Sequence, residues 1–443
     1  MRNANQKIQR LYELVRDQFY LGDEIFEIGD RKYVPLALFG ILNLILDGKE
    51  LIFGEYGSGK TSSSERISSL VKGLPLEFVQ ATTIHGHPEQ TEEKIKATLD
   101  LGRLEKEGEE VIKWKIIPYS PVVIIDEINR LPIGKQNMLL NEVDRNIWSY
   151  RGETLILKGG KSFFATINYQ DAGTTKLIAP LLDRFDLAVE TGVVHPIRKR
   201  VIRRGIDEEI LRDKGLTQEM IEYILKNCET RHSERVVQYI NQRAEEFKEE
   251  LEKRLRKKGL YLHIPRTEEV RGIIRQMEEL EISEDAELFL DYVGQEIYCQ
   301  RTLKKDFSRC SGCHYTNYLC SDLYHISNRA EQSLFKYSKA LAWMAGEEVV
   351  TLEHVIAVIP HALWHRSEVS DEKLSEVREL EKDSCDEFYA VCELMKEVKK
   401  RWEEHRDYQI EAYLALKEGD NERLVRMADK IDHPFFKSLV REL

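Results

Sequence analysis

Two short stretches of the sequence carry side chains suited to binding nucleotide phosphates. The first, GEYGSGKTS at 54–62, has the glycine, lysine and threonine spacing of the phosphate-binding P-loop. Glycines let backbone N–H groups curl around phosphates, and the start of a helix adds a favourable dipole. Lys60 is expected to reach the β- and γ-phosphates, and Thr61 to ligate Mg²⁺. The predicted nucleotide-binding residues are Gly54, Gly57, Ser58, Gly59, Lys60, Thr61 and Ser62.

The second stretch, VVIIDEIN at 122–129, is a buried β-run that ends in two adjacent carboxylates. Ligands of open α/β sheets bind beyond the carboxyl edge of the strands. Asp126 is therefore predicted to serve the Mg²⁺ ion together with Thr61. Glu127 is predicted to be the catalytic base that orients or deprotonates an attacking water.

The elements that must position these residues are readable from the apolar pattern. Up to about residue 193, the short runs ELIFG, LEFVQA, PVVIIDE, KSFFATIN and DLAVETG alternate with amphipathic helical patterns. Such alternation predicts an α/β fold with a parallel sheet. The stretch 34–46 is expected to be a core helix, and 231–259 one long charged helix that ends at a C-cap glycine. The rest of the chain has an almost wholly helical pattern.

Three longer stretches resemble the MoxR-type branch of the AAA+ ATPases, which is related to magnesium-chelatase subunits and distantly to MCM helicases. They are IIDEINRLPIGKQNMLLNEVDRNIW, FFATINYQ and APLLDRFDL. The resemblance covers residues 30–200 and resumes at 327–366. It implies a P-loop AAA+ core with a parallel sheet, followed by an all-α lid and a helical tail, and it implies ATP as the nucleotide.

The same resemblance assigns three further roles. Asn168 corresponds to sensor 1, which helps to position the attacking water. Arg184 corresponds to the arginine finger that reaches a neighbouring subunit's site, and the alternative for it is an ion pair with Asp183 or Asp186. Arg329 corresponds to sensor 2, a lid arginine at the γ-phosphate. A finger that acts in trans requires a homo-oligomer, and the family implies a hexamer.

Two insertions also follow from the resemblance. The stretch IWSYRGETLILKGGKS between the carboxylates and sensor 1 corresponds to a hairpin that points toward the ring pore. IKWKIIPYSP at 112–121 is similar to the other insert of this branch.

Four of the seven cysteines lie within 22 residues, at Cys299, Cys310, Cys313 and Cys320. A C-x-x-C pair with two further thiolates can complete a tetrahedral metal site. Structural Zn²⁺, a [4Fe–4S] cluster and unliganded thiols all remain open, and His314 or His325 could replace one cysteine at zinc. Haem attachment and disulfides are not expected in a cytoplasmic protein.

Composition limits the class of protein. Apolar residues are 42% and charged residues 33%, and the net charge is −12. More than half of that charge lies in residues 367–443, which favours a tail that docks on a partner or caps the lid. No apolar stretch is long enough to span a membrane, and no signal peptide is recognised, so a cytoplasmic location is expected. The basic stretch at 197–205 is an example of a local feature that suits nucleic acid, and the favoured alternative for it is a solvated helix face.

These patterns predict four parts. They are an AAA+ α/β nucleotide-binding domain at 1–196, a helical connection at 197–263, a helical lid with the four cysteines at 264–366, and an acidic helical tail at 367–443. The expected function is ATP hydrolysis coupled to chaperone-like remodelling of a protein client, with a von Willebrand factor A-type partner. The alternatives are an MCM-like nucleic-acid motor and a non-catalytic nucleotide-dependent scaffold.

Overall fold

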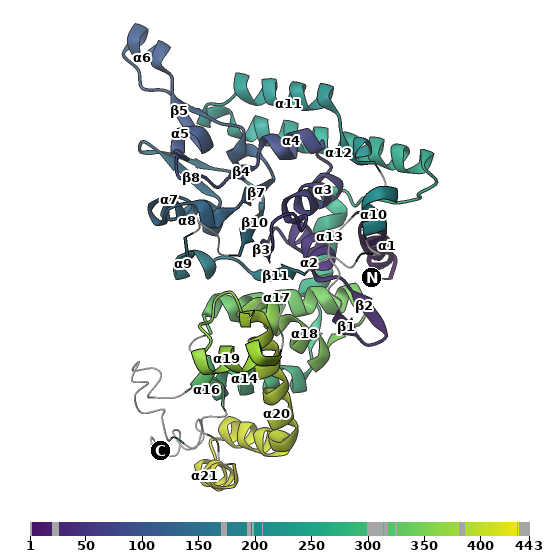
Figure 1. Cartoon of the computed structure of the whole chain (residues 1–443), viewed down its shortest axis with the longest axis vertical. Coiled ribbons are helices and arrows are strands. Elements are labelled where there is room, and N and C mark those ends of the chain that lie inside the picture. Colours follow the sequence, from purple (N-terminus) through teal and green to yellow (C-terminus); the bar gives the residue numbers. More distant parts are fainter. Residues whose placement is uncertain are drawn as a thin grey trace. The chain divides into compact units, whose positions relative to one another are not determined.

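The computed structural model describes residues 2–19, 26–169, 175–192, 196, 199–205, 207–298, 313, 318–323, 326–380, 386–431 and 433. Its contacts divide the chain into two compact units, Met1–Glu278 with Met344–Gly346, and Glu279–Trp343 with Glu347–Leu443. Figure 1 shows an α/β unit in purple to teal and a helical unit in green to yellow. The finer four-part division stays a prediction.

A five-stranded sheet lies at the centre of the first unit, with the strand order β11-β3-β10-β7-β4 and every pair parallel. Strand β10 is buried along its whole length, as expected for a parallel sheet covered on both faces. The predicted P-loop α/β core with a parallel sheet, followed by helical parts, is confirmed. The strands are β3 (Lys49–Gly54), β4 (Ile84–His85), β7 (Val122–Asp126), β10 (Ser162–Asn168) and β11 (Leu187–Thr191).

One predicted strand is wrong. The run LEFVQA forms a helix, α4 (Leu76–Ala81), and the fifth strand of the sheet is β4 instead. Pro75 is the residue before this helix, and its carbonyl accepts the N–H groups of Phe78 and Val79. A run of six residues, four of them apolar, fits either a strand or a buried helical turn, so the sequence period alone could not decide between them.

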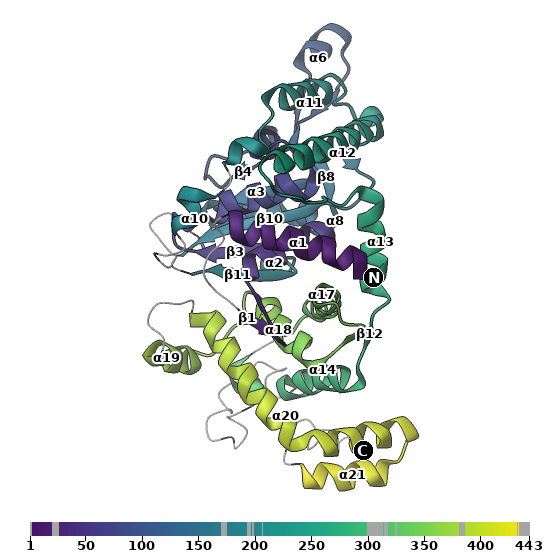
Figure 2. The same ribbon diagram turned by 90° about the vertical axis from the view of Figure 1, so that its right-hand side faces the viewer.

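Helices pack around the sheet. Helices α2 and α3 contact each other and the sheet, and α12 contacts α3 and lies beside α11, as Figures 1 and 2 both show. The predicted core helix and the predicted long charged helix are confirmed as α2 and α12, and Gly259 follows the latter at φ 80°. The helices of this unit are α1 (Arg2–Gln18), α2 (Pro35–Ile45), α3 (Lys60–Lys72), α4, α5 (Glu92–Ile95), α6 (Leu101–Glu107), α7 (Ile133–Met138), α8 (Leu140–Arg145), α9 (Ala179–Leu182), α10 (Lys199–Arg204), α11 (Lys214–Lys226), α12 (Ser233–Lys257) and α13 (Thr267–Glu278), with the 3₁₀ turns η1 (Ile117–Tyr119), η2 (Ile128–Arg130), η3 (Glu208–Leu211) and η4 (Thr230–His232).

Two antiparallel strand pairs extend from this core, and Thr230 joins them. The hairpin expected before sensor 1 is present as β8 (Ile147–Tyr150) and β9 (Glu153–Ile156), and the strands β5 (Ala97–Leu99) and β6 (Ile112–Trp114) form the other pair. Trp114 donates its indole N–H to the Thr230 hydroxyl at 2.8 Å, and that hydroxyl donates to Glu153. The Trp114 backbone N–H also donates to the Cys228 carbonyl, at 3.0 Å. A further pair, β1 (Phe26–Ile28) and β2 (Arg31–Tyr33), precedes α2.

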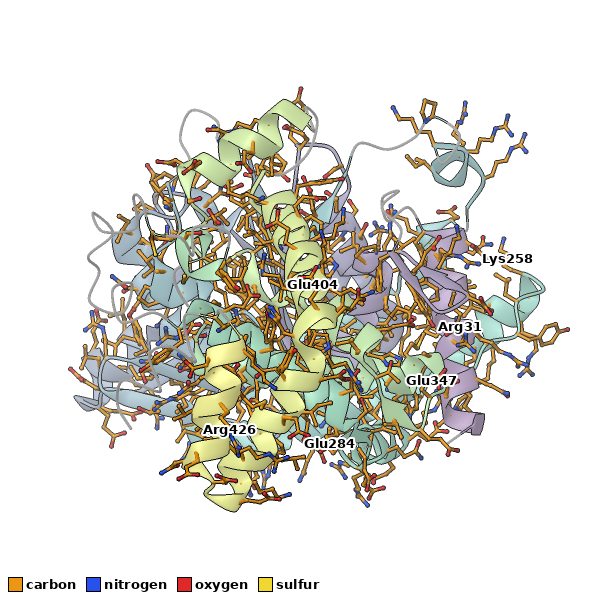
Figure 3. All side chains as sticks on the ribbon, turned by 90° about the horizontal axis from the view of Figure 1, so that it is seen from below. Arg31, Lys258, Glu284, Glu347, Glu404 and Arg426 are labelled. Carbon is orange, nitrogen blue, oxygen red and sulfur yellow. The ribbon has the colours of Figure 1, made fainter. Side chains whose placement is uncertain are left out.

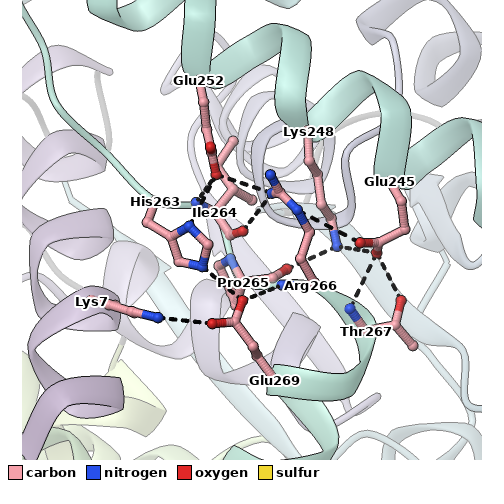
Figure 4. Close-up of polar contacts among 10 residues, drawn as sticks. All are labelled: Lys7, Glu245, Lys248, Glu252, His263, Ile264, Pro265, Arg266, Thr267 and Glu269. Carbon is pink, nitrogen blue, oxygen red and sulfur yellow. Dashed lines mark hydrogen bonds and ion pairs between the residues drawn. The ribbon is translucent and has the colours of Figure 1, made fainter.

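A polar cluster ties α1, α12 and α13 together (Figure 4). Lys248, of which 5% of the side chain is exposed, donates to the Pro265 carbonyl at 2.9 Å and to Glu245 at 3.0 Å. Glu269 accepts from Lys7 at 2.8 Å and from His263 at 2.7 Å. Burial opposes ionisation of Glu269, but these donors and a backbone N–H lower its pKa to about 2. Charged side chains therefore replace apolar packing at this joint between helices.

The second unit is almost wholly helical. Its elements are α14 (Glu284–Ile297), α16 (Leu319–Asp322), α17 (Asn328–Ala345), α18 (Leu352–Leu363), α19 (Asp371–Leu380), α20 (Asp386–Glu418) and α21 (Asn421–Lys430), with the short parallel strands β12 (Glu281–Ile282) and β13 (Val349–Val350). Arg401 of α20 forms a bidentate ion pair with the fully buried Glu296 of α14, with N–O distances of 2.8 and 2.7 Å. Figure 3 shows Glu284, Glu404 and Arg426 on the surfaces of α14, α20 and α21.

Gly419 lies between α20 and α21 at φ 71°, in the left-handed region that commonly ends a helix. In the part of the chain that the structure describes, no helix is both long enough and apolar enough to cross a bilayer.

Candidate active site

The predicted phosphate loop connects β3 to the start of α3. Gly57 and Gly59 have φ angles of 74° and 85°, in the left-handed region that glycine reaches without strain. The backbone N–H of Ser58 donates to the Glu55 carbonyl at 3.3 Å, which closes the loop into a turn. Helix α3 has thirteen residues, so the N–H groups of its first turn and its dipole face the loop. This arrangement can bind an anion.

Lys60 is buried against this loop. Its ammonium donates to the carbonyls of Gly54 at 2.8 Å and Glu55 at 2.7 Å, and the residue is only 5% exposed. Burial lowers the pKa of Lys60 to about 8, although Asp126 and Glu127 oppose the shift. A phosphate would therefore have to take the place of two backbone carbonyls as the partner of this ammonium.

Thr61 and Asp126 are brought together, as predicted for two ligands of one Mg²⁺ ion. The Thr61 hydroxyl donates to the carboxylate of Asp126, which also accepts from the Thr166 hydroxyl at 2.8 Å. His85 of β4 places Nδ1 3.5 Å from the other carboxylate oxygen. A hydroxyl and a carboxylate in direct contact are hard oxygen donors of the kind that Mg²⁺ prefers, so these residues fit the ion.

Glu127 is held by its backbone and at both carboxylate oxygens. Its φ and ψ are 50° and 51°, and its N–H donates to Thr166 at 2.8 Å. Asn168 donates its amide to Oε1 at 2.5 Å, and Arg130 places Nε 2.7 Å from Oε2. A Cβ on Gly86 would lie 2.0 Å from the Glu127 carbonyl oxygen, so the neighbouring strand fits closely against this backbone.

Asn168 lies at the carboxyl end of β10, where the resemblance places sensor 1. Its carbonyl accepts from the Asn129 amide at 2.8 Å, and its Cα pairs in register with Gly54 of β3. Gly54 in turn pairs with Thr191 of β11. The phosphate loop and the predicted water-positioning group therefore lie in one row across the sheet.

Arg184 follows helix α9 and is largely covered, with 17% of its side chain exposed. The guanidinium donates to the Pro180 carbonyl and lies 3.7 Å from Asp144. The ion pair that the structure describes is thus with Asp144, rather than with the Asp183 or Asp186 suggested by the sequence. Its role as an arginine finger stays a prediction.

Arg329 and the cysteine cluster belong to the second unit. Arg329 lies in the first turn of α17, and its assignment as sensor 2 stays a prediction. Cys320 is buried in α16 and Cys313 is partly exposed, whereas Cys299 and Cys310 lie outside the described residues. Helix α16 ends at Asp322, so no continuous helix runs from Cys320 to Arg329.

In the described residues, no three His, Cys, Asp or Glu side chains are grouped as metal ligands. With two of the four cysteines outside that part, the zinc or iron–sulfur site also stays a prediction.

Sequence reasoning missed four residues of this site. Thr166 contacts the Asp126 carboxylate and the Glu127 backbone N–H, Arg130 pairs with Glu127, His85 approaches Asp126, and Thr191 contacts the phosphate loop. The available signal was that Thr166 and Thr191 are polar residues in apolar β-runs. Which of them meet the site depends on strand order and register, and a single sequence does not reveal either.

Comparisons with known proteins concern the family of two segments and the fold. Residues 50–185 match the AAA domain of the dynein-related subfamily, and residues 320–383 match the AAA lid domain. A solved structure of a provisionally assigned ATPase from Cytophaga hutchinsonii has a TM-score of 0.52 and 16% identity, and the match covers 84% of this chain and 91% of that one. At that identity the likeness concerns the fold alone. No curated protein matches this sequence.

Proposed function

We propose that this chain, an AAA+ ATPase by its core and lid, hydrolyses ATP with Mg²⁺ as a ring-forming, MoxR-type machine that remodels a protein client. The observation that carries the proposal is the meeting of Lys60, Thr61, Asp126, Glu127 and Asn168 at one edge of the sheet. Phosphoryl transfer needs a phosphate cradle, a cation site and a group that handles the attacking water, and these residues supply all three.

The contacts suggest a division of labour. When ATP binds, the Lys60 ammonium exchanges the loop carbonyls for the phosphates as its partners. Thr61 and Asp126 would hold Mg²⁺, which would neutralise charge on the phosphate oxygens. The Asn168 amide remains hydrogen-bonded to Oε1 of Glu127. Oε2 is therefore the atom that accepts the proton of the attacking water. Arg130 lies at Oε2 in this structure, so the attacking water has to share this oxygen with Arg130 or displace it. Gly57, Ser58, Gly59 and Ser62 complete the phosphate loop.

A ring follows from the role proposed for Arg184. A finger acts by stabilising charge that develops on a phosphoryl group in a neighbouring subunit. Here the side chain is largely covered and lies beside Asp144, so an approaching subunit has to draw it out. We propose a homo-hexamer, with Arg329 of the lid as sensor 2.

The experiment is ATP turnover by the full chain at several protein concentrations, with Glu127→Gln and Arg184→Ala variants. Glu127→Gln should bind ATP as the parent does and lose about 10²- to 10³-fold in turnover. Turnover per chain should rise with protein concentration, because the finger comes from another subunit. Mixing the two variants should restore activity, since each can supply what the other lacks. Equal turnover by Glu127→Gln and the parent would remove the role of Glu127 as the base, and a parent without turnover would leave only the non-catalytic scaffold.

The client is proposed by class only. Glu127→Gln with ATP bound should retain a protein client or a von Willebrand factor A-type partner, and Lys60→Ala, which lacks the phosphate-binding ammonium, is the matched control. Capture by both variants alike would mean that retention does not depend on nucleotide.

A nucleic-acid motor is the second candidate, and α10 favours it. The cationic side chains of Lys199, Arg200, Arg203 and Arg204 are exposed on this short helix. DNA binding that falls steeply with salt, together with DNA-stimulated turnover, would support this reading. ATP turnover that is equal with and without DNA would exclude the nucleic-acid motor.

A further inference from the structure

Thr191 is the last residue of β11 and lies beside the phosphate loop. It pairs in register with Gly54, the first glycine of that loop, and it is 4% exposed. No motif points to it, because β11 is far from the loop in sequence. Only the strand order brings the two together.

The hydroxyl of Thr191 has a defined place in a hydrogen-bond chain. It donates to the Phe53 carbonyl at 3.0 Å and lies 2.8 Å from the Ser58 hydroxyl. A hydroxyl has one hydrogen to give. Since Thr191 gives its hydrogen to Phe53, Ser58 must be the donor between the two hydroxyls. Lys60 approaches the Ser58 oxygen at 3.5 Å, so the chain runs from Lys60 through Ser58 and Thr191 to Phe53.

The same hydroxyl fills the space beside the loop's first glycine. A Cβ built on Gly54 would lie 2.1 Å from the Thr191 hydroxyl oxygen and 2.8 Å from the Thr191 carbonyl. Gly54 also has a φ of 154°, which a side chain rarely adopts. The glycine is thus required by the close approach of β11 as well as by its own backbone.

We propose that Thr191 is a positioning residue of the nucleotide site, which holds the phosphate loop through Ser58 in the shape that accepts a phosphate. Ser58 lies between Gly57 and Gly59, two left-handed glycines without side chains. Its hydroxyl is therefore the side-chain anchor of this part of the loop, and Thr191 is the fixed point to which it is attached. Without that contact the nucleotide-free loop samples more conformations. The entropic cost of ordering the loop on binding then weakens nucleotide binding. The inference rests on the proposed ATP site.

The test uses Thr191→Val, which keeps the branched shape and removes the hydroxyl, and Thr191→Ser, which keeps the hydroxyl. The Kd of a fluorescent ATP analogue and the KM and kcat for ATP are measured on the full chain. Loss of the neutral hydrogen bond that anchors Ser58 predicts roughly a five- to tenfold rise in Kd and KM for Thr191→Val, with kcat within about twofold. Thr191→Ser should match the parent. Ser58→Ala should also raise Kd and KM, and the double variant should lose less than the sum of the two single variants, because both remove the contact between Ser58 and Thr191.

Unchanged Kd and KM in Thr191→Val would overturn the inference. So would an equal loss in Thr191→Ser, which would assign the effect to shape, or a fall in kcat alone. Thermal unfolding of each variant without nucleotide separates a misfolded chain from a loosened loop. The proposed function fails differently: the parent itself then binds ATP no better than Lys60→Ala.

Discussion

The buried ammonium of Lys60 predicts that ATP binding weakens in mildly alkaline solution. The perturbation is a change from about pH 7 to about pH 9. Burial lowers the pKa of this lysine to about 8 in the nucleotide-free chain, although neighbouring carboxylates oppose the shift. About nine-tenths of the side chains are then charged at the lower pH and about one-tenth at the higher.

The magnitude follows from assuming that ATP binds only the charged form, because the phosphates need the cation. The apparent Kd then rises about tenfold across this range, or ~1.4 kcal/mol. The last phosphate proton, with a pKa of about 6, is already gone, so ATP itself adds little to the change. Near pH 9, binding should also take up roughly 0.9 of a proton per site, since the bound phosphate restores the charge.

Calorimetric titration in two buffers of different ionisation heat measures both the Kd and the proton uptake. Lys60→Arg is the matched control, because an arginine stays charged throughout. Its binding is expected to be weaker but independent of pH. A Kd for the parent that is equal at the two pH values, or the same loss in the arginine variant, would refute the reasoning.

Three further predictions address other parts of the molecule. Glu50 is fully buried in β3, burial raises its pKa well above the usual value, and neither carboxylate oxygen has a hydrogen-bond partner among the described residues. The folded chain therefore holds a proton that the unfolded chain releases, and stability should fall as pH rises above about 4.5, by up to ~1.4 kcal/mol per unit. Glu50→Gln should flatten this slope in urea unfolding from about pH 5 to about pH 8, and parallel slopes would contradict it. Gly86→Ala should displace the Glu127 backbone and reduce turnover about 10²-fold while ATP binding is kept, and full turnover would show that the strand adjusts. Protein purified without oxygen should contain about one zinc or about four irons per chain at the four cysteines. Metal analysis and the visible spectrum measure this content. Metal-free protein would mean that these cysteines are unliganded thiols.

Residues that are close in sequence were the most predictable part of this site. The loop at 54–62 and the pair Asp126 and Glu127 each follow a β-run, so their meeting at the carboxyl edge needed only the parallel sheet. The helices α2 and α12 were predictable because each has a long apolar or amphipathic pattern and a glycine or proline near one end.

What escaped prediction depends on distances between segments. Arg184 meets Asp144 because the chain after α9 returns beside α8, and no local pattern encodes that approach. Thr191 reaches Ser58 because β11 lies next to β3 in the strand order. The run LEFVQA was misassigned for a different reason, since six residues contain too few periods to separate a strand from a helix.

The Thr230 hydroxyl gives the first unit a mechanical property. Hairpin β8–β9 is fixed to it through Glu153, and the pair β5–β6 through Trp114, while Thr230 itself lies one turn before the 25-residue helix α12. A force applied to either strand pair is therefore transmitted to the other pair and to the N-terminal end of helix α12. Removing the Thr230 hydroxyl should therefore weaken this coupling, while the contacts from Tyr150 to Glu93 and from Trp114 to the Cys228 carbonyl remain.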